Sequence, residues 1–239
     1  LFKPGDRLST SVIDETARNL RALLFLGEID VRTRQVATDS IDVIVSVRDL
    51  YSRALTPLLS GEPGELSYGV VGLDYNLLGS GQVLQVTALH DAVTGNEGEV
   101  FYRAPRWFGS RSALTGTARL GGEGFDVSLR ATRPFYRLSE RWSYWVTTRG
   151  TRELVRLYSA QTEAERYEAN RFDATARVTG SWGDRVKAKP GVEMSFASRQ
   201  FDPDTGFSYA PEDRRRATVL ATMTVWRPSF EHVRYYQSL

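Results

Sequence analysis

The sequence has no cysteine, and its 239 residues include only two histidines. Without cysteine there is no disulfide framework and no cysteine-ligated zinc, haem or iron–sulfur site. Neither His90 nor His232 stands in a local group of carboxylate and nucleophile that acid–base chemistry would need. We therefore predict no metal, no cofactor and no catalytic residue, which means that the protein is not an enzyme.

Net charge and long hydrophobic runs are also scarce. Lys and Arg number 31 against 29 Asp and Glu, so the formal net charge is +2 and nucleic acid is not an expected partner. The longest purely apolar stretch, Ala22 to Leu26, is far shorter than the roughly 18 residues that indicate a membrane-spanning helix. The lack of a long apolar run does not exclude a membrane β-barrel, because the strands of such a barrel alternate apolar and polar residues.

The first fifty residues combine one helix with two strands. Apolar residues spaced three and four apart predict an amphipathic helix from Ser11 to Leu24, with Ser11 as its N-cap and Gly27 in a left-handed conformation after its end. Alternating apolar residues predict strands at Ile29 to Val36 and Ile41 to Asp49. Residues 1–52 are therefore expected to form a small α+β domain whose first strand is missing.

Residues 53–65 are rich in proline and glycine and are predicted to be a linker. No helical period follows, and about eleven strand candidates fill residues 66–239. The candidates are Ser67 to Tyr75, Gln82 to His90, Glu99 to Ala104, Ser112 to Leu120, Phe125 to Arg133, Arg141 to Arg149, Arg152 to Ser159, Tyr167 to Trp182, Arg185 to Phe201, Arg214 to Trp226 and Phe230 to Leu239.

Strand length and aromatic placement decide between a soluble sandwich and a membrane barrel, because the strands of both folds alternate apolar and polar residues. The run from Phe172 to Trp182 would span roughly 33 Å, or roughly 23 Å of height at the tilt usual in membrane barrels. Phe172 and Trp182 would then mark two membrane interfaces. We predict a mainly β fold, the N-terminal part of an antiparallel transmembrane β-barrel. We expect Phe125, Val127, Leu129, Ala174, Ala176, Val178, Val219 and Ala221 to face outward, and Arg130, Arg177, Thr179 and Glu193 to face inward.

Three segments resemble a known family. Gly72 to Gln82 is similar to the first barrel hairpin of the bacterial surface-antigen family of outer-membrane assembly factors, the BamA/TamA-like proteins, and Arg133 to Trp142 is similar to a later strand–loop–strand of that barrel. The helix and two strands before residue 53 resemble the last polypeptide-transport-associated (POTRA) domain of these proteins. The family barrel has sixteen strands and a late Arg-Gly-Phe-type loop that is missing here, so we expect a fragment.

The resemblance implies a protein of the bacterial outer membrane with its N-terminal domain in the periplasm. It implies a non-enzymatic role in the assembly or insertion of other outer-membrane proteins, through a lateral strand gate and β-augmentation. The expected partners are outer-membrane lipid, unfolded outer-membrane protein clients or a secreted substrate, and periplasmic or lipoprotein accessory factors. Strand parity places residues 76–81, 134–140 and 202–213 outside the cell.

Two sets of residues are candidates for binding a client strand. The first strand after the linker contributes Ser67, Gly69, Val71 and Gly72, where the glycines would weaken a gate; the alternative is that Gly69 and Gly72 relieve crowding at a barrel corner. The second set, Ile29, Val31 and Thr33, would be the POTRA edge, and its alternative is an ordinary sheet strand.

Two other functions stay open from the sequence. A two-partner secretion barrel shares the predicted architecture and exports one substrate. A passive or lipid-modifying barrel belongs to a different class, but a pore needs no helix–sheet domain at its N-terminus, and a lipid-modifying enzyme needs a Ser/His/acid cluster that the strands do not supply.

Overall fold

A computed structural model describes residues 5–7, 9–21, 23, 25–62, 65–92, 94–135, 140–160, 162–183 and 186–227. The chain is mainly β and divides into two compact units, Leu1–Ala104 and Pro105–Leu239. The strand predicted at Phe230 to Leu239 lies outside the described residues. No helix in the described ranges is long and apolar enough to cross a membrane.

The first unit begins with the predicted helix and hairpin. Helix α1 spans Thr10–Arg21, and strands β1 (Leu26–Ala37) and β2 (Ser40–Asp49) pair antiparallel in a two-stranded sheet. The N–H of Leu26 donates to the carbonyl oxygen of Leu23 at 3.3 Å, in the turn between helix and hairpin. This turn comes before Gly27, which lies within β1 and not in the left-handed cap we predicted.

The helix starts one residue before Ser11, so the predicted N-cap is inside α1. The carbonyl oxygen of Ser9 accepts the N–H of Ile13 at 3.3 Å. Ala17 is one of the few buried apolar residues, and α1 contacts β1. One helix on two strands is a small unit, and no POTRA domain is evident among the described residues.

Four further strands of the first unit follow in sequence order: β3 (Arg53–Glu62), β4 (Glu65–Leu77), β5 (Gln82–Asp91) and β6 (Gly95–Ala104). The prediction of a linker at residues 53–65 is therefore wrong, because β3 pairs along its length with β4. Two features explain the error. Pro57 is tolerated in a strand that has a neighbour on one side only. Gly61 adopts φ +114°, and a Cβ there would lie 2.1 Å from the carbonyl oxygen of Glu65.

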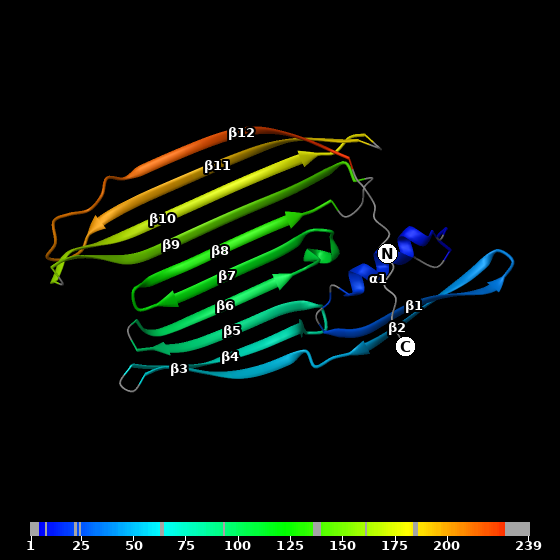
Figure 1. The fold of residues 1–239 in the computed structure, drawn as a ribbon, viewed down its shortest axis with the longest axis horizontal. Coiled ribbons are helices and arrows are strands. Elements are labelled where there is room, and N and C mark those ends of the chain that lie inside the picture. The colour runs from blue at the N-terminus through cyan, green and yellow to red at the C-terminus, as the bar shows by residue number, and fades with distance from the viewer. Residues whose placement is uncertain are drawn as a thin grey trace. The chain divides into compact units, whose positions relative to one another are not determined.

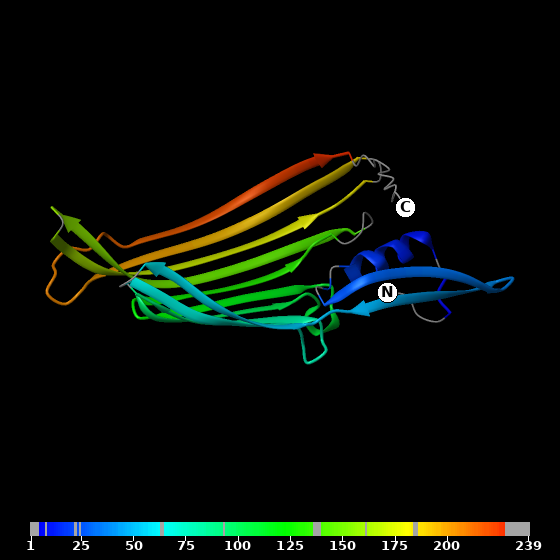
Figure 2. The same ribbon diagram turned by 60° about the horizontal axis from the view of Figure 1, so that its bottom comes forward.

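The second unit is a run of six antiparallel strands, preceded by a short 3₁₀ turn at Trp107–Gly109. Figures 1 and 2 show these strands side by side as a single layer. Within their units, β3 pairs only with β4 and β12 only with β11, so the sheet is not closed in the described residues. The strands are β7 (Ala113–Gly121), β8 (Gly124–Arg133), β9 (Trp142–Ser159), β10 (Thr162–Gly180), β11 (Lys187–Pro203) and β12 (Arg214–Trp226).

Strand β9 joins two segments that the sequence analysis separated. It runs without interruption through Gly150 and Thr151, which pair with Phe172 and Arg171 of β10. Because β9 is one strand and not two, each later strand runs in the direction opposite to the one predicted. The β8–β9 loop and the β11–β12 loop (residues 204–213) therefore emerge at opposite strand ends, and the prediction that both lie outside the cell is wrong.

Candidate functional site

One face of the β8–β12 layer is apolar and exposed. The register aligns Ala131, Val146, Ala176, Met194 and Val219 in one row that crosses all five strands. The exposed fractions of Met194 and Val219 are 58% and 69%. Soluble proteins rarely leave so continuous an apolar surface uncovered.

The opposite face of the same strands is polar and carries a ladder of ion pairs. Asp173 accepts two hydrogen bonds from Arg199, at 2.8 and 3.1 Å. These side chains are half-buried although they are charged. Further pairs on this face are Asp126 with Arg149 (2.5 Å), Glu153 with Arg171 (2.7 Å) and Glu193 with Arg177 (3.8 Å).

Burial is thus inverted relative to a soluble protein, as predicted from the alternation. Phe125, Val127, Leu129, Ala176, Val178, Val219 and Ala221 are exposed, while Arg177, Thr179 and Glu193 are half-buried. Two residues depart from the prediction. Ala174, on the apolar face, is only half-exposed, and Arg130, on the polar face, is exposed in a row of threonines and a serine that offers it no acid.

The four candidate residues of β4 lie in a strand that is paired on both sides. Val71 is opposite Thr56 of β3 and Thr87 of β5. The expectation of a free edge along β4 is therefore wrong, because the segment read as a linker occupies that edge as β3. Ser67 has a local role, since its hydroxyl donates to Asp91 at 3.1 Å and accepts the N–H of Ala92 at 3.2 Å.

Gly69 and Gly72 differ in the space around them. A Cβ on Gly69 would lie 2.4 Å from the carbonyl oxygen of Ala88, whereas the nearest atoms to a Cβ on Gly72 are 3.9 Å away. Gly69 thus relieves crowding between two backbones, which is the alternative that we kept open. No such constraint acts on Gly72.

The second candidate set lies in β1. Ile29, Val31 and Thr33 face Val47, Val45 and Val43 of β2. Because the described sheet has two strands, β1 has a strand neighbour on one side only. An edge is therefore present where the sequence analysis expected one.

The edge of β3 was not predicted from the sequence. Leu55 and Leu59 are exposed by 76% and 74%, and β3 pairs with β4 alone in its unit. An edge strand with exposed apolar side chains can add a further strand. Leu55, Pro57 and Leu59 are spaced two residues apart, which is typical of a strand. The proline instead favoured the prediction of a linker.

The turn between β4 and β5 also lies where it was not expected. The amide oxygen of Asn76 accepts the N–H of Gly81 at 2.8 Å and closes the turn. A Cβ on Gly81 would lie 3.5 Å from the ring of Phe25 and 3.6 Å from the side chain of Leu23. The turn therefore lies beside the segment that follows α1, so it cannot be outside the cell while that segment is in the periplasm.

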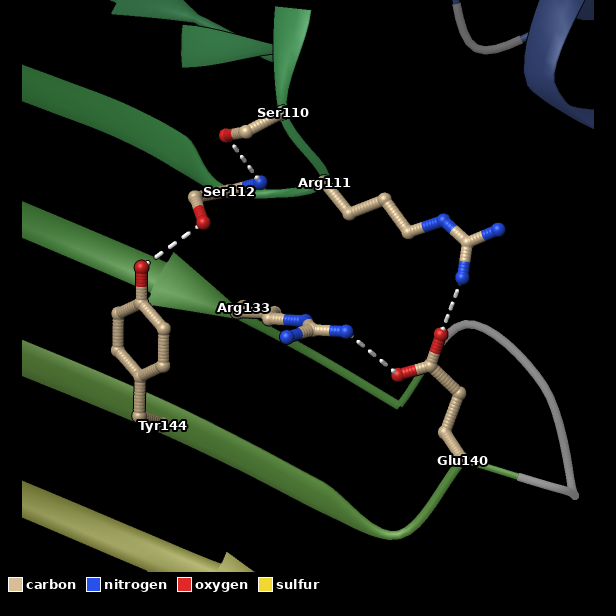
Figure 3. A network of polar contacts seen from close by, with 6 residues as sticks. All are labelled: Ser110, Arg111, Ser112, Arg133, Glu140 and Tyr144. Carbon is tan, nitrogen blue, oxygen red and sulfur yellow. Dashed lines mark hydrogen bonds and ion pairs between the residues drawn. The ribbon is translucent and has the colours of Figure 1, made fainter.

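A buried carboxylate just before β9 links this strand to the end of β8 and to the segment before β7, within the stretch that carried the second resemblance. Glu140, whose side chain is 8% exposed, binds Arg111 at 2.6 Å and Arg133 at 3.3 Å (Figure 3). In the same view, the hydroxyls of Ser112 and Tyr144 share a hydrogen bond of 2.8 Å between β9 and the segment before β7. These contacts join the segment before β7, the end of β8 and the start of β9.

No family model matches the chain, and no curated protein matches it. Among solved structures, the chain is similar to BamA from Haemophilus ducreyi lacking POTRA domains 1–3, with 15% sequence identity and a TM-score of 0.46. The match covers 84% of this chain and 47% of that protein, so the chain spans about half of its length.

Proposed function

We propose that this chain is part of a bacterial outer-membrane β-barrel protein that assists the assembly or insertion of other outer-membrane proteins, without enzymatic chemistry. Its surroundings would be outer-membrane lipid, with α1, β1 and β2 in the periplasm in the manner of a POTRA domain. Its partners would be unfolded outer-membrane proteins, helped by periplasmic or lipoprotein accessory factors.

The observation that carries the proposal is the inverted burial of β8–β12. Leaving one valine or methionine side chain in water instead of an apolar phase costs about 1.5 to 3 kcal/mol. The apolar rows repeat this cost across five strands, whereas lipid would remove it. The ion-pair ladder on the other face needs water or polar neighbours. A sheet with lipid on one side and water on the other satisfies both faces.

The assembly role rests on the edge of β3. Its exposed backbone and its leucines, Leu55 and Leu59, offer a template to which an unfolded strand can pair through main-chain hydrogen bonds. Such pairing needs little sequence specificity, which suits a factor with many clients. The edge of β1 offers a second template on the helix–hairpin part of the chain.

The test is depletion of the protein in its native bacterium, followed by quantification of the outer-membrane proteome. Assembly predicts that many β-barrel proteins fall together. Loss of one secreted product would favour the two-partner secretion alternative. An unchanged proteome with slower solute uptake would favour a passive pore, and either result would contradict the assembly role.

A matched pair of variants tests the edge itself. Leu55 of β3 and Val86 of β5 face the same side of the sheet, because both are in register with Gly72. Leu55→Lys places a charge on the edge, whereas Val86→Lys places the same charge on an internal strand. We expect Leu55→Lys to reduce client assembly more than Val86→Lys does. Equal effects would show that the sheet face matters and not the edge.

A further inference from the structure

Two lysines of β11 lie on the polar face without an acidic partner. Lys187 is 7% exposed, and Lys189, two residues later, points to the same face. Neither makes an ion pair or a hydrogen bond with a residue that the structure describes. A lysine with so little exposed surface is unfavourable without an anion, and two positive charges that are neighbours on one face repel each other.

The ammonium group of Lys189 is held between two aromatic rings. Its nitrogen lies 5.0 Å from the ring centre of Phe135 and 4.7 Å from that of Trp226, which is opposite Lys187 in the register. Rings attract a cation but do not neutralise its charge. The arrangement therefore fixes the position of one positive charge and leaves that charge available to an anion.

The nearest acid along this face of β11 is already engaged. Glu193 is paired with Arg177 at 3.8 Å, and Arg177 donates a second contact, at 3.0 Å, to the hydroxyl of Thr222. Between that pair and Lys189 lies Gly191, where a Cβ would approach the hydroxyl oxygens of Thr222 and Thr179 to 2.9 and 3.0 Å. The face beside the lysines thus presents hydroxyl groups and no spare carboxylate among the described residues.

We propose that Lys187 and Lys189 bind a phosphate group on the polar face of the sheet. A phosphate carries up to two negative charges and several acceptor oxygens, so one group can neutralise both ammonium groups, which a single carboxylate cannot do. The rings of Phe135 and Trp226 hold one of the two cations in place. The proposal goes beyond the assembly role, because it requires no client protein.

The test is a titration of the folded chain in a detergent without phosphate, such as octyl glucoside, followed by calorimetry. The two probes are inorganic phosphate and dihexanoyl phosphatidic acid, with sodium chloride as the control for ionic strength. We expect saturable binding of phosphate below about 1 mM. Binding of phosphatidic acid at least about tenfold tighter than inorganic phosphate assigns the site to a lipid headgroup, and equal binding assigns it to free phosphate.

The decisive variant is K187Q/K189Q, with R214Q/R216Q as its matched control. Arg214 and Arg216 lie on the same face of the neighbouring strand, at the other end of the register, so the control removes the same charge. We expect the lysine variant to weaken phosphate binding about tenfold or more and the arginine variant to leave it within about twofold.

Equal weakening by the two double variants, or no saturable binding to the unaltered chain, would overturn the proposal. If K187Q/K189Q does not fold, as judged by circular dichroism, K189Q alone carries the test, because Lys189 is half-exposed. Failure of this test leaves the assembly proposal untouched, since the proteome experiment does not depend on phosphate.

Discussion

At the scale of single residues, Gly69 and Gly72 make a matched pair within β4. We expect Gly69→Ala to lower the free energy of unfolding by about 1 to 3 kcal/mol, because its Cβ would meet the carbonyl oxygen of Ala88. Gly72→Ala should change it by less than about 0.5 kcal/mol. Urea unfolding in detergent micelles measures the free energy of unfolding of both variants. If the two substitutions cost the same, backbone crowding is not what Gly69 relieves.

Glu140 gives a second prediction for a single side chain. Glu140→Gln removes the charge that two arginines share, so we expect a loss of about 2 kcal/mol, smaller than for a fully buried pair because Arg111 and Arg133 are partly exposed. Trypsin cleavage after Arg141 should accelerate. Glu212→Gln, at an exposed position in the β11–β12 loop, is the control. Unchanged cleavage would show that the carboxylate does not hold the start of β9 in place.

At the scale of strands, the two faces of β8–β12 should meet different solvents. The sequence has no cysteine, so single cysteines can be introduced without background. In bilayers, a fluorescent label at Val127, Val178 or Met194 should be quenched by brominated acyl chains, because these side chains are on the apolar face. A label at Ser128, Thr179 or Ser195 should be quenched by aqueous iodide. The reverse pattern, or no difference between the faces, would exclude the membrane assignment.

The strands also show what sequence patterns can predict. Strong alternation of apolar and polar residues predicted the bounds of β8 and β12 to within one residue, because successive side chains of a strand point to opposite faces of the sheet. Prolines and glycines caused the errors. Pro57 hid β3, and Gly150 split β9, because pairing with neighbours outweighs local propensity at these positions.

The candidate site was harder to predict than the strands. The sequence predicted β4 and β1 as strands, but whether a strand lies at the edge of a sheet depends on whether another strand pairs with its second side. That is a long-range property, and one missed strand moved the edge from β4 to β3. The lysine site has no sequence motif either, since Lys189 meets Phe135 and Trp226 only through the order of the strands.

At the scale of the whole molecule, the evidence for function is the pattern of its surfaces. Each unit contributes an end strand with one neighbour, and the second unit contributes an apolar and a charged face to one layer. None of these features is a pocket for a substrate. They suit a protein that works through surfaces and edges, in contact with lipid and with other chains.

The unequal strand lengths have a consequence for detection on cells. The register of β9 with β8 ends at Glu153, whereas its pairing with β10 continues to Ser159. Strand β11 still pairs with β10 as far as Tyr167, opposite Val155, so only the last four residues of β9 belong to a two-stranded ribbon, which is roughly 13 Å long. A ribbon of that length would project from a lipid surface, where Tyr158, 65% exposed, is within reach of an antibody. Antibody staining of intact against permeabilised bacteria would therefore reveal on which side of the membrane this end of the strands lies.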